Sequence, residues 1–141
     1  MDTRRFVTGT LAGGVTLFVL GYLIFDLAFA SFYQANSGSA TGVMREGQLV
    51  WAVILGSLSY GALITYVMGS RTEPMTVGAG ATIGVVVGFL LWFTANFILY
   101  GVTNLANLTR TVIDPILEAV RAGVAGAVIA AALARMRVAV R

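Results

Sequence analysis

Three long uncharged stretches constrain the fold of this chain more than any other feature of its sequence. They cover 6–25, 47–70 and 74–109, and they contain 20, 24 and 36 residues. A bilayer core of about 30 Å is crossed by roughly 20 apolar helical residues, so each stretch is long enough to cross once. The third stretch should end its helix near Gly101, because this residue is followed by Asn104 and other residues typical of loops.

A fourth span is predicted over 114–136, although charges interrupt it. Asp114 suits an N-cap and Pro115 suits the first position of a helix. Glu118 and Arg121 follow, and the strictly uncharged part after them has only thirteen residues, so a short interfacial or re-entrant helix is the alternative. The predicted fold is an all-α integral membrane protein, a single membrane domain over 1–141 with spans at about 6–30, 48–69, 76–100 and 114–136.

The arginines give the predicted orientation of the chain. All nine positive charges are arginines, and six of them fall on one side of the predicted spans: Arg4, Arg5, Arg71, Arg135, Arg137 and Arg141. Arg45 and Arg110 fall on the other side. The positive-inside rule places the six-arginine side, with both termini, in the cytoplasm, and the loops 34–47 and 101–111 outside. The four spans then form two helical hairpins.

Two other interpretations of these segments stay open. Arg4, the apolar stretch and Ala28-Phe29-Ala30 together resemble a cleaved secretory signal, but the stretch is longer than the usual 7–15 residues or so. Sliding the first half of the chain onto the second matches Gly14 with Gly84. A tandem repeat of this kind would relate the hairpins by an axis along the membrane normal.

The chain contains no cysteine and no histidine. There is therefore no disulfide, no thiolate nucleophile, no imidazole base and no metal site built from these ligands. We therefore expect the chain to have no enzymatic activity and to bind no metal and no cofactor. The net charge of +3 does not indicate binding to nucleic acid, because the arginines lie between apolar stretches and form no cluster on a polar domain.

Small residues recur at every fourth position on three of the predicted helices. This spacing places them on one helix face, where two backbones can approach closely. The predicted helix-packing residues are Gly9, Gly13, Gly80, Gly84, Gly88 and Gly126, the last in a run with Ala122, Ala130 and Ala134. These faces either pack the helices of one chain together or leave one face exposed to dock another chain.

Charged residues inside a bilayer are costly and usually face the bundle interior or water, so they are candidates for a site. Asp114, Glu118 and Arg121 are spaced so that they share one face of the fourth helix. The candidate polar cluster combines them with residues expected at a similar outer depth: Asp26, Asn96, Tyr100, Asp114, Glu118 and Arg121. Three interpretations of this cluster stay open. Glu118 and Arg121 form only a local pair, whose arginine snorkels to the outer head groups. Alternatively, the cluster is a substrate or proton site, or it is a contact between subunits.

Several motifs resemble one group of bacterial proteins. The segments 9–14 (GTLAGG), 20–24 (LGYLI), 32–33 (FY) with 35–36 (AN), and 103–108 (TNLANL) are similar to small four-helix bacterial membrane proteins that form a domain-of-unknown-function family. The resemblance covers most of the chain. It implies four spans and a location in the bacterial inner membrane, and it brings no catalytic or ligand residues.

The sequence therefore predicts a non-enzymatic membrane subunit that packs through small-residue helix faces with itself or with a larger membrane complex. The alternative is a small oligomeric transporter or channel with a polar site in the outer half of the bundle. A membrane enzyme comes third, because the chain lacks an evident base, nucleophile or metal set. The expected partners are the lipid bilayer and either further copies of the chain or other membrane subunits, with no nucleic acid.

Overall fold

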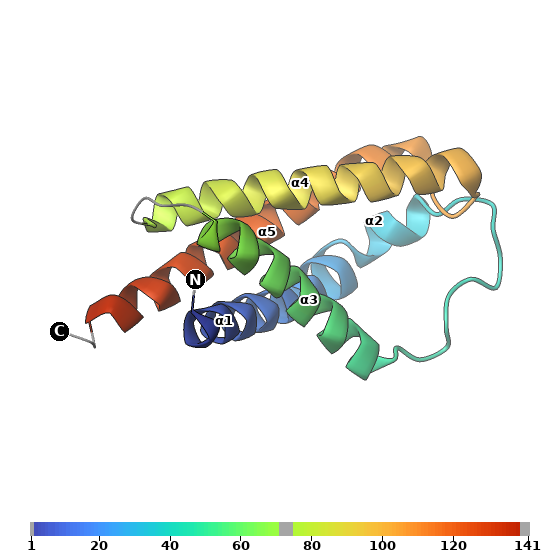
Figure 1. Cartoon of the computed structure of the whole chain (residues 1–141). Coiled ribbons are helices and arrows are strands. Elements are labelled where there is room, and N and C mark those ends of the chain that lie inside the picture. Colours follow the sequence, from blue (N-terminus) through green and yellow to red (C-terminus); the bar gives the residue numbers. More distant parts are fainter. Residues whose placement is uncertain (1, 71–74, 139–141) are drawn as a thin grey trace.

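A computed structural model of the protein describes residues 2–70 and 75–138. In these ranges the elements are α1 (Thr3–Gly21), the π-helical segment η1 (Tyr22–Ala28), α2 (Ala30–Ala35), α3 (Val50–Gly69), α4 (Val77–Val102) and α5 (Leu108–Val138). η1 continues α1 directly (Figure 1). The described residues form no β-strand, only one isolated bridge between Ser37 and Ala106.

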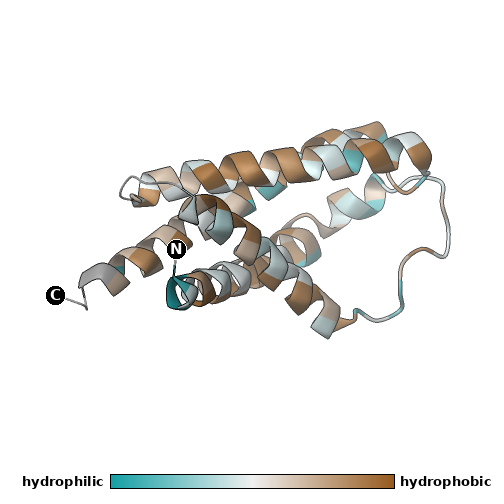
Figure 2. Cartoon of the chain, viewed as in Figure 1, coloured by the Kyte–Doolittle hydropathy of each residue, from teal (hydrophilic) through white to brown (hydrophobic). Residues whose placement is uncertain are grey.

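Four helical segments are long and apolar enough to cross a membrane. They are Thr3–Ala28, Val50–Gly69, Val77–Val102 and Leu108–Met136. Hydrophobic residues are spread along all four (Figure 2), and many large apolar side chains are exposed, as a lipid-facing surface requires. The prediction of an all-α protein with four such helices is confirmed. Arg71 and Arg141, two of the arginines that orient the chain, lie outside the described residues.

The expected start of the fourth helix at Asp114 is wrong. α5 begins at Leu108, and Pro115 lies inside it. Asn107 supplies the cap, because its Oδ1 accepts a hydrogen bond from the backbone N–H of Arg110 at 2.9 Å. Proline removes one helical hydrogen bond, which packed membrane helices tolerate. The 31 residues of α5 also argue against the short interfacial helix considered from the sequence.

The helices are packed unevenly. α4 and α5 contact each other over most of their length, whereas α1 packs on both α3 and α5. α3 makes few contacts with α4 or α5, so it is held to the bundle mainly through α1. In Figure 1 the start of α1 and the end of α5 lie at one end of the molecule, and the α2–α3 and α4–α5 connections lie at the other.

α4 and α5 approach closely because glycines on each helix face the other's backbone. A Cβ added at Gly84 would collide with the carbonyl group of Ala122, and one added at Gly126 would collide with the carbonyl group of Gly80. Only glycine allows backbones to come this near. The α4–α5 contact therefore depends on residues that lack a side chain.

α1 uses glycines in the same way against α3 and α5. A Cβ added at Gly61 of α3 would lie 2.6 Å from the backbone nitrogen of Gly14. Gly9 and Gly13 lie against the side chain of Ile129 on α5, where added Cβ atoms would be 3.3 and 2.6 Å from its carbon atoms. The glycines of the predicted packing faces thus lie against other helices of the same chain.

The two connections at the far end of the bundle are joined by hydrogen bonds. The backbone N–H of Gly38 donates to the carbonyl oxygen of Leu105 at 3.1 Å. Asn36 and Asn107 are joined twice, through the backbone at 3.2 Å and through their side-chain amides at 3.0 Å. These bonds fix the end of α2 beside the start of α5.

Replacing Gly84 by leucine should destabilise the protein, because its side chain would have to displace the Ala122 backbone. Overpacking of this kind costs roughly 1–3 kcal/mol, so thermal unfolding in detergent should occur at a clearly lower temperature. The matched control is Gly78→Leu on the same helix, where an added Cβ meets nothing within 4 Å. Equal unfolding temperatures for the two variants would contradict the close α4–α5 contact.

Candidate functional site

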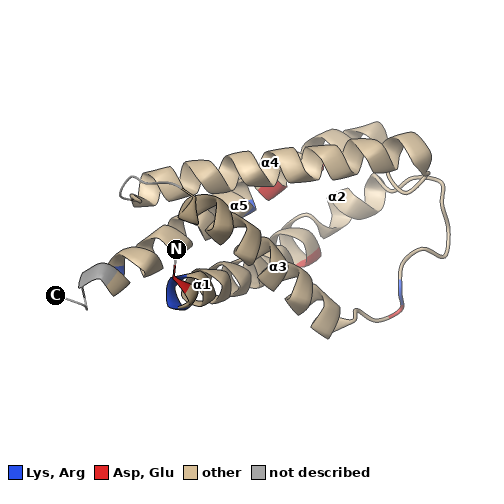
Figure 3. Cartoon of the chain, viewed as in Figure 1, with Lys and Arg blue, Asp and Glu red and all other residues tan. Residues whose placement is uncertain are grey.

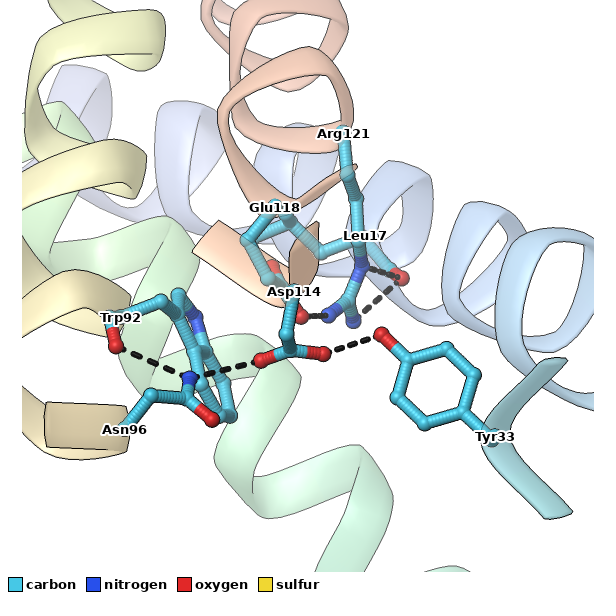
Figure 4. A network of polar contacts seen from close by, with 7 residues as sticks. All are labelled: Leu17, Tyr33, Trp92, Asn96, Asp114, Glu118 and Arg121. Carbon is cyan, nitrogen blue, oxygen red and sulfur yellow. Dashed lines mark hydrogen bonds and ion pairs between the residues drawn. The ribbon is translucent and has the colours of Figure 1, made fainter. Parts of the chain in front are cut away.

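A carboxylate on α5 is held by two neutral donors from different helices. Asp114 is 7% exposed. Its Oδ2 accepts from Nδ2 of Asn96 at 2.7 Å, and its Oδ1 accepts from the hydroxyl of Tyr33 (Figure 4). Burial raises the pKa of Tyr33 above its ordinary value, and the neighbouring Asp114 carboxylate raises it further. The Tyr33 hydroxyl therefore stays protonated and donates.

Glu118 and Arg121 form an ion pair that also ties α5 to α1. Nη1 of Arg121 donates to Oε1 of Glu118 at 2.8 Å. Its Nε and Nη2 both donate to the carbonyl oxygen of Leu17, at 2.9 and 2.7 Å (Figure 4). The two side chains are buried, since Glu118 is 2% and Arg121 8% exposed. A buried ion pair is tolerated when its remaining donors are also hydrogen-bonded, as these largely are.

The end of α1 is shaped to receive the guanidinium group. A Cβ added at Gly21 would lie 2.8 Å from Nη2 of Arg121, so glycine leaves the space that the arginine fills. η1 begins at the next residue, and π-helical turns of this kind frequently mark functional sites. From η1, the ring of Phe25 lies 5.5 Å from the guanidinium carbon, within cation–π range.

The structure corrects two expectations about Arg121. The side chain does not snorkel to the outer head groups, because it turns inward to α1. It lies thirteen residues after Leu108, which is roughly 20 Å along α5, and so near the middle of the candidate span Leu108–Met136. The ion pair is therefore deeper in the bundle than the sequence indicated.

The remaining two residues of the predicted polar cluster lie elsewhere. Asp26 accepts a hydrogen bond from Nε2 of Gln48 at 2.8 Å, at an exposed position. Tyr100 is 43% exposed on α4, and its side chain makes no hydrogen bond within the described ranges. The structure thus brings together four of the six predicted residues, as the Asn96–Asp114 and Glu118–Arg121 pairs.

Three participants were missed by reasoning from the sequence. Tyr33 appeared only within the FY motif at 32–33, although it reaches Asp114 from 81 residues away. The Leu17 carbonyl has no signature in the sequence, because every residue has one. Gly21 was counted with a sequence motif and not as space for an arginine.

The charges around the site balance. Few charged residues lie within the helices (Figure 3). Arg110 lies with its guanidinium carbon 4.8 Å from the ring centre of Tyr33. Together with Arg121 it offsets the two carboxylates, Asp114 and Glu118. Within residues 2–70 and 75–138 no group of three or more acidic residues gathers where it could hold a metal ion.

A crevice opens between α3 and α4 beside the ion pair. Its volume is about 480 Å³, within the range of pockets that bind small molecules. Arg121 lines it together with Tyr60 of α3 and Trp92 of α4, and Val53 and Leu91 add apolar side chains. It is open to the outside of the bundle, because α3 and α4 have few contacts.

Buried polar atoms near this crevice have no hydrogen-bond partner in the described part of the chain. They are Oη of Tyr60, Nε1 of Trp92 and Oε2 of Glu118, and the first two lie close to each other. Tyr60 is 8% exposed, and its hydroxyl lies against Gly88, where an added Cβ would be 2.9 Å from Oη. An unpaired buried polar group costs roughly 1–3 kcal/mol, so these atoms can gain from a partner that enters the crevice.

Replacing Glu118 alone by glutamine should destabilise the protein more than replacing Glu118 and Arg121 together by glutamine. The single change leaves an arginine that cannot lose its proton without a counter-charge, and breaking a buried pair costs roughly 3–5 kcal/mol. Unfolding temperatures in detergent would measure the difference, with Glu46→Gln in the exposed α2–α3 connection as the control. A double variant less stable than the single one would show that the Leu17 contact dominates.

A comparison of the chain with known protein families, with curated proteins and with solved structures finds no match. The chemistry available to the site therefore follows from its own residues. They provide a buried ion pair, further hydrogen-bond donors and an adjacent crevice of ligand size.

Proposed function

We propose that the chain is a non-enzymatic, multi-pass protein of the bacterial inner membrane that binds a ligand within its helical bundle, as a small transporter or carrier does. The observation that carries this proposal is the buried Glu118–Arg121 pair, which borders an open crevice near the middle of α5. Ionisable residues at membrane depth are expensive, and they commonly mark a ligand site or an ion pathway.

A subunit that packs through small-residue faces is less well supported. That function needs a small-residue face left free for another chain, whereas Gly9, Gly84 and Gly126 lie against helices of their own chain. The apolar side chains that remain exposed, such as Leu90 and Phe93, suit lipid as well as they suit a protein partner. Oligomers formed through such residues are compatible with ligand binding.

Ligand binding without catalysis fits the chemistry of the residues at the site. The chain has neither histidine nor cysteine. Tyr33 and Asn96 engage both oxygens of Asp114, and Arg121 engages Oε1 of Glu118. An active site would need a base or a nucleophile poised for reaction. A ligand held here would meet donors and an ion pair, which bind and orient.

The proposed topology places both termini in the cytoplasm, with the spans as two helical hairpins. Reporter fusions after Gly38 and after Arg141 should report opposite sides of the membrane, because six of the nine arginines fall on the side of the termini. A fusion after Gly42, in the same connection as Gly38, serves as the matched control and should agree with it. The same side for Gly38 and Arg141 would contradict the topology.

Ligand binding can be tested by filling the crevice. A Cβ added at Gly56, which lines it, meets nothing within 4 Å, so Gly56→Leu should fold and occupy the space. A ligand in the crevice would clash with the leucine side chain, so its affinity should fall about tenfold or more, which corresponds to roughly 1.4 kcal/mol or more. Native mass spectrometry of protein released from membrane nanodiscs should show a small-molecule adduct on the wild type that Gly56→Leu loses.

Gly78→Leu is the control for that experiment, because Gly78 is equally unobstructed and does not line the crevice. It should retain the adduct. A wild type without any adduct, or a Gly56→Leu variant that retains it fully, would contradict binding at this site.

A further inference from the structure

We infer that the crevice between α3 and α4 takes an uncharged lipid whose head group carries a carbonyl oxygen, and that the lipid enters sideways from the bilayer. The inference rests on the proposed function, since it names the class of ligand that the same site would hold. It depends on where the crevice opens, on the charge balance around it and on which polar atoms lack partners.

The opening of the crevice faces outward from the bundle. Val53, Leu63 and Leu91 contribute to it and are each about two-fifths exposed, at 43%, 38% and 42%. These residues belong to two helices apolar enough to cross a membrane, so the opening lies where acyl chains would surround it. A ligand dissolved in the bilayer reaches it directly, and its chain can lie against the apolar sides.

The charge balance selects an uncharged head group. Arg121 is already paired with Glu118, and Arg110 lies over Tyr33, the residue that donates to Asp114. The α5 charges nearest the site therefore sum to zero. A carboxylate, phosphate or ammonium head group would bring an unbalanced charge into the bundle, where uncompensated charges are disfavoured.

The unpaired atoms select a hydrogen-bond acceptor. The indole N–H of Trp92 can only donate, and it lies close enough to the Tyr60 hydroxyl oxygen to donate to it. The Tyr60 O–H is then the donor that lacks an acceptor in the described chain. A carbonyl oxygen accepts from the Tyr60 hydroxyl. Oη of Tyr60 is buried, so a head group reaches it as α3 moves slightly away from α4, which the few contacts between these helices permit.

Quenching of tryptophan fluorescence by brominated lipids tests both parts of the inference. The chain has two tryptophans, and Trp51 is 67% exposed at the start of α3. Replacing Trp51 by phenylalanine leaves Trp92 as the reporter in the crevice. Three probes with the same dibrominated chain are added to the protein in liposomes: the methyl ester, the free acid and the amine.

The methyl ester should quench Trp92 saturably, at a mole fraction roughly tenfold or more below that of either charged probe. Adding Gly56→Leu should remove the saturable quenching, and adding Gly78→Leu should leave it unchanged. Tighter quenching by the acid or the amine overturns the uncharged head group, while the adduct seen by native mass spectrometry would still support ligand binding. Equal, unsaturable quenching by all three probes overturns lipid entry altogether. Water would then be the partner of the buried polar atoms.

Discussion

The guanidinium group of Arg121 is buried among apolar helices and needs partners there, and the position of α1 against α5 follows from that need. Arginine keeps its proton in proteins, and hydrocarbon offers no acceptor. The Leu17 carbonyl on α1 and the Glu118 carboxylate on α5 are the acceptors that the fold provides. Two N–H groups meeting one carbonyl define both distance and direction, so a shift of either helix by one residue would break the contact. Gly21 supplies the space in which it forms.

A second polar layer repeats this principle nearer to the connections. Asp114 draws donors from α2 and α4, because Tyr33 and Asn96 both point at its carboxylate. Hydrogen bonds between the two connections, such as that from Gly38 to Leu105, fix α2 at the place where Tyr33 can reach Asp114. The connections and the buried carboxylate are therefore parts of one structure. The charged face of α5 determines which segments gather around it.

The apolar stretches were enough to locate the helices, since length and hydropathy are properties of the sequence itself. The start of α5 was misplaced because Asp114-Pro115 is a strong local signal, whereas the cap comes from Asn107 seven residues earlier. Asp26 was expected in the cluster because of its depth. The orientation of its side chain depends on the π-helical segment η1 that carries it and on Gln48, which donates a hydrogen bond to it. All but one of the side-chain hydrogen bonds of Asp114 and Arg121 join distant segments, and a backbone acceptor such as Leu17 cannot be recognised from residue types.

The crevice lies where the glycine contacts end. α4 meets α5 through facing glycines, and α1 meets α3 through Gly14 and Gly61, but α3 and α4 share no such face. Gly56 and Gly78, one on each of them, have nothing within 4 Å of an added Cβ. α5 presents its small residues to α4 and its arginine to α1, so α3 has no close partner beyond α1. The gap that results lies between α3 and α4. Arg121 of α5 lines it together with residues of these two helices.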